Sequence, residues 1–268
     1  MIKALFFDMD GTLLNSESKL SVKTVEALED CKRKGIMIFP ATGRPPLLDR
    51  MLGLNRQESL LLGDGGVFYN GGCVSRNGRK LYTTIDDNVM CAIDALISGM
   101  PHLNMAVQMV DEKHSFRFDL SDEFLIGWGI DRDMIEPYES GKRRDIVKLF
   151  LFSFNDEIDM KELYVRVNAL GLNIKAYMTG QERLLEIVAP AVSKKTGIEK
   201  LLDHYRLDPS EIAVFGDDSN DLEMLSGFRN SVAMGNAKNE IKAAAGYVTL
   251  SNAEEGVAHA LKDFLHII

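Results

Sequence analysis

Short apolar runs alternate with amphipathic segments in the first and last parts of the chain. A continuous apolar run of about four residues is typical of a strand buried on both faces of a sheet. Such runs predict strands at residues 4–7, 36–39, 60–62, 212–215, 232–234 and 247–248. The intervening segments predict helices at residues 21–34, 45–54, 193–205, 217–225 and 253–265. Strands that alternate with helices favour a parallel sheet with helices on both faces.

The pattern changes between residues 84 and 188. Here the predicted strands are longer and alternate more clearly between apolar and polar positions. We expect strands at residues 104–109, 115–118, 148–152, 174–178 and 184–188. Amphipathic stretches predict helices at residues 87–98, 122–128 and 158–170. The chain is therefore expected to form an α/β core, a doubly wound parallel sheet made of residues 1–83 and 189–268, with an α+β domain inserted at residues 84–188.

Composition narrows the class of protein. The chain has 268 residues, of which 46% are hydrophobic and 26% charged, as is ordinary for a globular enzyme. A net charge of −9 disfavours nucleic acid and anionic membranes as partners. Three cysteines without paired spacing argue against a disulfide framework or a zinc site. No apolar window has the length of a membrane span or a signal peptide, so we expect a cytoplasmic protein of unassigned oligomeric state.

Two carboxylates follow the first predicted strand directly. Asp8 and Asp10 are two residues apart, so in an extended segment their side chains would point to the same side. Gly11 allows the chain to turn sharply after them. Like charges this close require a cation or a shared proton, and Mg²⁺ is the simplest candidate because it prefers oxygen ligands. A plain Asp–Gly turn is the alternative at this point.

Further polar residues follow the second predicted strand. Thr42, Gly43 and Arg44 combine a hydroxyl, a backbone amide and a nearby helix start, which suit a phosphate group. The alternative is that Thr42 only caps the next helix. Lys194 lies early in the predicted helix at 193–205, where a positive charge is slightly unfavourable and indicates another role. A solvated surface lysine is the alternative.

An acidic cluster follows the predicted strand at 212–215. Asp217, Asp218, Asn220 and Asp221 stand within five residues, and Asp217 and Asp221 would share a helix face if a helix began there. Capping and the helix dipole account for one or two of these acids, not for the whole cluster. The carboxyl ends of parallel strands meet at one edge of a sheet. The two aspartates after the first strand, residues 42–44, Lys194 and this acidic cluster can therefore converge there. The set contains carboxylates that could hold Mg²⁺, a candidate nucleophile and hydrogen-bond donors for a phosphate group. Together these favour phosphoryl transfer as the reaction.

These motifs resemble those of the haloacid dehalogenase superfamily of phosphatases, specifically its Cof-type subfamily with a large α/β cap of the C2B type. The likeness covers the whole chain and is strongest at residues 8–14, 41–44, 185–187, 192–194, 216–225 and 232–237. It implies a Rossmann-like core. It also implies that the inserted domain is a cap that closes over the site and sets substrate specificity.

The resemblance also implies a role for each candidate residue. Asp8 is similar to the nucleophile that forms an aspartyl-phosphate, and Asp10 to the general acid that protonates the leaving alcohol and then activates water. Mg²⁺ would be held by Asp8, the backbone carbonyl of Asp10 and Asp217, with Asp221 as a ligand or a support. The implied phosphate-binding residues are Thr42, Gly43, Lys194 and Asn220, with Arg44 on the substrate side.

The sequence departs from the family pattern at two places. The family usually has Asn-Gly-Ala after the third strand, where this chain shows Asp64-Gly65-Gly66 and so gains a carboxylate near the carboxyl edge of the sheet. The lysine of the third motif is usually followed by Gly, and here by Lys195. Neither change removes a residue that the chemistry needs, so activity is expected.

We therefore expect a Mg²⁺-dependent phosphatase acting on small phosphate monoesters, such as sugar phosphates or related metabolites. A phosphomutase on the same fold and a non-catalytic metabolite-binding protein are the alternatives. A dehalogenase is disfavoured because such enzymes usually lack the second Asp, having no alcohol leaving group to protonate. The residues that select the substrate are not assigned by the sequence.

Overall fold

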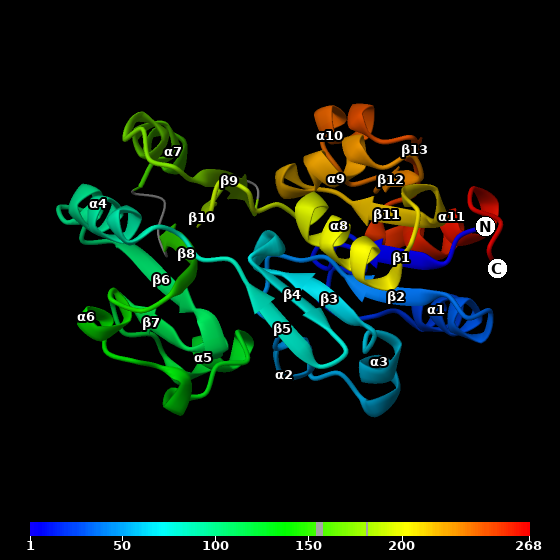
Figure 1. Cartoon of the computed structure of the whole chain (residues 1–268), viewed down its shortest axis with the longest axis horizontal. Helices are drawn as coiled ribbons and strands as arrows, with labels where there is room; N and C mark the ends of the chain where they lie inside the picture. The colour runs from blue at the N-terminus through cyan, green and yellow to red at the C-terminus, as the bar shows by residue number, and fades with distance from the viewer. Residues whose placement is uncertain (154–157, 181) are drawn as a thin grey trace. The chain divides into compact units, whose positions relative to one another are not determined.

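The computed structural model describes residues 1–153, 158–180 and 182–268 of the chain. These form two compact units. The first contains Met1–Leu81 and Ser193–Ile268, and the second contains Tyr82–Val192 (Figure 1). Among the helices in these ranges, none combines the length and apolar character that crossing a bilayer requires.

The first unit is built on a parallel sheet of five strands. Its strands stand in the order β13-β12-β11-β1-β2, so that β1 lies between β2 and β11 (Figure 1). The strands are β1 (Ala4–Phe7), β2 (Met37–Pro40), β11 (Ile212–Gly216), β12 (Ser231–Ala233) and β13 (Tyr247–Val248). Phe7 is in register with Pro40 on one side and Phe215 on the other, so three carboxyl ends align. The predicted α/β fold is confirmed.

Helix caps and apolar faces explain how helices attach to this sheet. Ser21 caps α1 (Val22–Arg33) by accepting from the Thr24 N–H at 3.1 Å. Ser193 and Thr196 form a capping box on α8 (Lys194–Tyr205). The C-terminal part of this unit also contains α9 (Leu222–Gly227), α10 (Asn239–Ala244) and α11 (Gly256–Asp263). Apolar side chains of α8 and α9 pack in one core with those of β1, β2 and β11, among them Phe6, Phe39, Ile198, Leu201, Val214 and Met224.

The predicted strand at 60–62 is wrong, because these leucines belong to α3 (Arg56–Leu61) and its C-cap. Asn55 and Glu58 form a capping box that starts this helix, a signal that a short apolar run obscures. The strand that follows β2 is β3 (Gly65–Phe68). It pairs antiparallel with β4 (Cys73–Arg76), in a small sheet completed by β5 (Arg79–Tyr82). The predicted helix at 45–54 is shorter, covering α2 (Leu48–Leu52).

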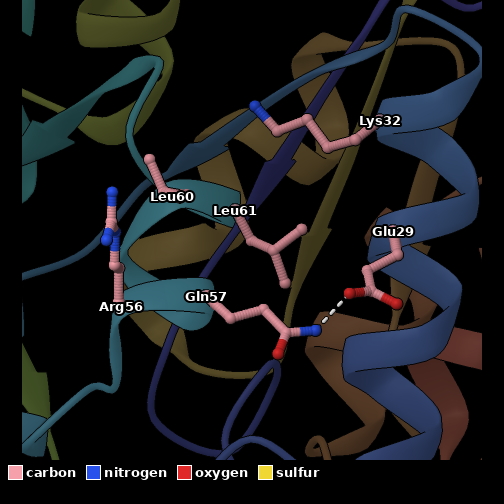
Figure 2. A pocket seen from close by; sticks show the side chains of 6 residues that line it. All are labelled: Glu29, Lys32, Arg56, Gln57, Leu60 and Leu61. Atoms are coloured by element: carbon pink, nitrogen blue, oxygen red, sulfur yellow. Dashed lines mark hydrogen bonds between the residues drawn. The ribbon is translucent and has the colours of Figure 1, made fainter.

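A hollow of about 520 Å³ lies between α1 and α3 (Figure 2). Leu61 points into it, and Glu29, Lys32 and Gln57 line it. Three of the polar lining side chains have partners: the Gln57 amide donates to Glu29, and Lys32 pairs with Asp64. The hollow is thus a feature of the packing of α3 against α1.

The second unit contains an antiparallel sheet in the order β7-β6-β8-β10-β9, as the α+β prediction requires. Its strands are β6 (Leu103–Met109), β7 (His114–Phe116), β8 (Ile146–Ser153), β9 (Lys175–Thr179) and β10 (Leu184–Val188). Its helices are α4 (Asp87–Ile97), α5 (Asp122–Gly127), α6 (Tyr138–Gly141) and α7 (Met160–Ala169). Apolar residues of α4 and α7 pack in one core with the sheet, and an aromatic cluster with Leu125 of α5 forms another.

Several polar side chains are buried in this second sheet. Lys148 and Glu186 form an ion pair at 2.6 Å, and Thr179 donates to Glu186 at 3.0 Å. His114 is fully buried, and the Gln108 amide nitrogen lies 3.5 Å from its ring. Burial, the largest influence, lowers the pKa of His114 to about 4. The folded protein therefore holds this imidazole neutral at pH values where the unfolded chain would protonate it.

We predict that His114 makes the protein lose stability in mild acid. Because its folded pKa lies below its unfolded value of about 6.5, the unfolded state binds more protons, and stability falls as pH drops from about 6.5 toward 4, by about 3 kcal/mol in total. Urea unfolding of wild type and His114→Leu across this range measures the effect, and the variant should show a shallower pH slope. His102→Gln, at an exposed histidine of the same unit, is the control; equal slopes for wild type and His114→Leu would contradict the prediction.

Candidate active site

Asp8 is placed at the carboxyl end of β1. The chain leaves the strand there, with the Asp8 N–H donating to Phe215 O at 2.9 Å, and the Asp8 side chain is buried. Gly11 adopts a left-handed φ of +83°, and a Cβ at this position would lie 2.3 Å from Oδ2 of Asp217. Glycine is therefore required for the loop after β1 to approach Asp217 so closely.

The loop after β11 differs from its prediction, because no helix begins at Asp217. Instead, the chain forms a short 3₁₀ turn, η5 (Ser219–Asp221), before α9. The Asp221 carboxylate folds back, and its Oδ2 accepts from the N–H groups of Asp217 and Asp218 at 2.8 and 3.0 Å. Asp217 and Asp221 are brought together by this loop, and not by a shared helix face.

Lys194 connects these two loops. It is the first residue of α8 and is fully buried. Its Nζ lies 2.5 Å from Oδ1 of Asp8 and 2.6 Å from Oδ1 of Asp221. Burial alone would lower the pKa of Lys194, but the two carboxylates outweigh it and raise that pKa above its usual value. Lys194 is thus a permanent cation within the site, and not a solvated surface lysine.

Three aspartates form a group that could hold a divalent cation. Carboxylate oxygens of Asp8, Asp217 and Asp221 all lie within 4.8 Å of one another. Burial raises the pKa of Asp8 well above its usual range, although Lys194 opposes this. Burial and the Asp221 charge raise the pKa of Asp217 to about 7. Clustered carboxylates that resist ionisation are suited to a hard cation that takes oxygen ligands, because its charge favours their ionised form.

Asp217 is held in place by two further side chains that the sequence did not single out for this role. The Thr12 hydroxyl donates to Oδ1 of Asp217 at 2.6 Å. The Asn236 amide donates to Oδ2 at 3.3 Å and to Gly11 O at 2.9 Å. Both residues lie within motifs that carry the family resemblance, but only the fold shows that they converge on Asp217.

The Asp10 carboxylate does not belong to the group of three aspartates. It receives two hydrogen bonds from Arg44, from Nε to Oδ2 at 2.7 Å and from the second guanidinium nitrogen to Oδ1 at 2.6 Å. Burial alone would lower the pKa of Arg44, and the hydrogen bond to Asp10 raises it above its usual value. A bidentate pair of this kind fixes the plane of the carboxylate. Arg44 was predicted to contact the substrate, and in the structure its guanidinium binds the Asp10 carboxylate.

Thr42 and Gly43 lie in the loop after β2. Thr42 is buried, its N–H donates to Val67 O at 2.8 Å, and its hydroxyl accepts from the Arg44 N–H at 3.1 Å. The next helix, α2, has Leu47 as its N-cap, so Thr42 does not cap it. The hydroxyl stabilises the turn that carries Gly43 and Arg44.

Asn220 is buried and donates from Nδ2 to Oδ1 of Asn70 at 3.0 Å. Sequence reasoning missed Asn70, because the misplaced third strand put the wrong residues at its end. With the strand at β3, the residues that follow include Asn70-Gly71-Gly72, so the family's usual Asn-Gly is present after all. Asp64 is not an extra carboxylate at the carboxyl edge. It accepts from the Ile38 N–H at 2.8 Å and pairs with Lys32.

Comparison with known proteins agrees with this geometry. The model of the haloacid dehalogenase-like hydrolase family matches residues 5–261, and the chain belongs to that family. The resemblance inferred from the motifs is thereby confirmed, and the protein is a hydrolase of the phosphatase class. A putative phosphatase of Haemophilus influenzae is 28% identical over 267 residues, covering 98% of each chain.

Two further relatives have more specific names. The 5-amino-6-(5-phospho-D-ribitylamino)uracil phosphatase YitU of Bacillus subtilis is 26% identical, over 97% of this chain and 96% of its own. The solved structure of the subclass IIB sugar phosphatase BT4131 has a TM-score of 0.84 and 27% identity, covering 99% of this chain and all of its own.

We predict that replacing Lys194 destabilises the protein strongly. In Lys194→Met the buried carboxylates of Asp8 and Asp221 lose their cation, which should lower the free energy of unfolding by about 3–5 kcal/mol in metal-free buffer. Lys195→Met is the matched control, because Lys195 forms only a half-exposed pair with Glu199 and its loss should cost about 0–1 kcal/mol. Urea denaturation with EDTA present measures both. Similar losses in the two variants would show that the buried cation is unimportant.

Proposed function

We propose that the protein is a Mg²⁺-dependent phosphatase that hydrolyses small phosphate monoesters through an aspartyl-phosphate on Asp8. The observation that carries this proposal is the buried Asp8 carboxylate at the end of β1, 2.5 Å from Lys194 and grouped with Asp217 and Asp221. A carboxylate in that environment is oriented and kept from bulk water, as a nucleophile requires.

In the first step, a carboxylate oxygen of Asp8 attacks phosphorus and the bond from phosphorus to the ester oxygen breaks. Asp10 supplies a proton to the leaving alcohol. In the second step, Asp10 takes a proton from water, the water oxygen attacks phosphorus, and inorganic phosphate leaves with the Asp8 carboxylate restored. The bidentate contact with Arg44 orients the Asp10 carboxylate for the second step, in which it accepts a proton. To donate a proton in the first step, Asp10 must release one of these hydrogen bonds and carry a proton on that oxygen.

The phosphate group would be bound by Thr42, the Gly43 amide, Lys194 and Asn220. Lys194 supplies a fixed positive charge, while the loop after β2 and the loop after β11 supply uncharged donors. Because phosphoryl transfer develops charge on the phosphate oxygens, donors fixed before the reaction lower its barrier.

Magnesium would be held by Asp8, Asp217 and the backbone carbonyl of Asp10, with Asp221 as a support. Oδ2 of Asp221 already accepts two backbone N–H groups and its Oδ1 accepts from Lys194, which favours the supporting role. When bound, the ion would neutralise charge between the Asp8 carboxylate and the phosphate.

The names of two relatives support the proposed substrate class. BT4131 is described as a sugar phosphatase, and YitU acts on a phosphorylated ribityl compound by its name. We propose that this chain likewise takes phosphate esters of sugars or of related metabolites.

We predict that Asp8→Asn abolishes phosphate release. An amide cannot form the aspartyl-phosphate, so kcat should fall at least about a thousandfold with the fold intact. Release from a panel of sugar phosphates, nucleotides and cofactor phosphates, measured for wild type and variant, tests this. Asp30→Asn is the matched control on the surface of α1, where Asp30 pairs with Arg33, and it should keep wild-type activity.

The same panel distinguishes a phosphatase from a phosphomutase. Free inorganic phosphate as the product supports hydrolysis, whereas an isomerised ester without phosphate release would overturn it in favour of a mutase.

We also predict that metal removal stops the reaction and lowers the melting temperature of the protein. EDTA should reduce turnover to background, and added Mg²⁺ should restore it, because Asp8 and Asp217 then ionise against a cation. Mg²⁺ should raise the melting temperature of wild type and have a smaller effect on Asp217→Asn. Full activity in EDTA would rule out the metal-dependent mechanism.

A further inference from the structure

The turn that follows β3 contacts three separate parts of the proposed phosphate site. This turn is η1 (Tyr69–Gly71), and its residues lie in the first unit. The Tyr69 N–H donates to Arg44 O, and the Asn70 N–H donates to Thr42 O, each at 3.0 Å. A Cβ on Gly71 would lie 2.2 Å from the carbonyl oxygen of Ser193, directly before Lys194. The turn thus packs against the loop after β2 and the start of α8.

The third contact is made by the Asn70 side chain. Its Oδ1 accepts from Nδ2 of Asn220 at 3.0 Å, and Asn70 is fully buried. An amide nitrogen carries two hydrogens, and Asn70 accepts only one of them. The bond therefore sets the rotation of the Asn220 amide and directs its second N–H.

The backbone of this turn is held in an uncommon conformation. Tyr69, Asn70 and Gly71 have φ values of 51°, 56° and 102°, three consecutive residues on the left-handed side. Residues other than glycine adopt such angles uncommonly, and strained positions of this kind gather at functional sites. Asparagine tolerates the conformation better than most residues, which fits its place at position 70.

We propose that Asn70 is a positioning residue, which orients the Asn220 amide toward the phosphate group while its backbone fixes the Thr42 loop. This inference rests on the proposed phosphatase function. Asn70 itself acts through Asn220, so its loss should weaken phosphate binding without removing the nucleophile or the metal ligands.

Asn70→Gly is the sharpest test, because glycine accepts the left-handed backbone and only the side-chain amide is lost. We expect KM for the best phosphate ester, and the inhibition constant of inorganic phosphate, to rise about tenfold together, as for loss of one oriented hydrogen bond. Asn77→Gly is the matched control. Asn77 also has a positive φ, of 47°, but is exposed in the turn between β4 and β5, so KM should not change.

A double-mutant cycle separates positioning from general loosening of the fold. In an Asn220→Ala background, Asn70→Gly should have little further effect on KM, because the amide that it orients is already gone. An undiminished effect in that background, or an unchanged KM in the single variant, would overturn the inference.

The ¹⁵N-labelled side-chain amide of Asn220 gives a readout that needs no turnover. Asn70→Gly should shift its resonances, and Asn77→Gly should not. If wild type releases no phosphate but the Asn220 resonances shift in Asn70→Gly and on adding inorganic phosphate, the phosphatase proposal fails while the positioning of Asn220 stands. Resonances that do not move in Asn70→Gly would overturn the positioning role itself.

Discussion

The buried contact of Lys194 with Asp8 and Asp221 is the interaction on which the rest of the site depends. It joins the first residue of α8 to the loops after β1 and β11, which are far apart in sequence. Without this cation, the clustered carboxylates of Asp8, Asp217 and Asp221 would repel one another. Lys194 favours the ionised form of these carboxylates, and a bound divalent ion would favour it further. Lys194 thus offsets the repulsion among the clustered carboxylates in the folded protein. The carboxylates can still bind a divalent cation.

The site is assembled from side chains whose own hydrogen-bonding capacity is largely taken up by neighbours. Asp10 is held by Arg44, Asp217 by Thr12 and Asn236, and Asn220 by Asn70. Each of these partners comes from a different loop at the carboxyl ends of the strands. Such support restricts the rotation of the reacting groups before the substrate binds. Preorganised sites lower the barrier to phosphoryl transfer in this way.

Local signals predicted the elements well where one signal dominated, and failed where two competed. The buried strands at 4–7 and 212–215 and the capped helices at Ser21 and Ser193 are present in the structure. The leucines at 60–62 were misinterpreted, since a three-residue apolar run fits the end of a helix as well as a strand. The glycine-rich β3 has too few apolar side chains to be recognised, and Asn70 was missed with it.

The sequence by itself determined the order of the motifs, the parallel α/β core, the inserted α+β unit and the residue types needed for phosphoryl transfer. These depend on periodicity and on short-range spacing, which a single chain displays directly. Only the tertiary structure decided which side chains meet: that Lys194 contacts Asp221 as well as Asp8, that Arg44 holds Asp10, and that Asn70 holds Asn220. These pairs join residues between 27 and 186 positions apart, and a contact at such separation is set by how elements pack, a property that no local pattern encodes.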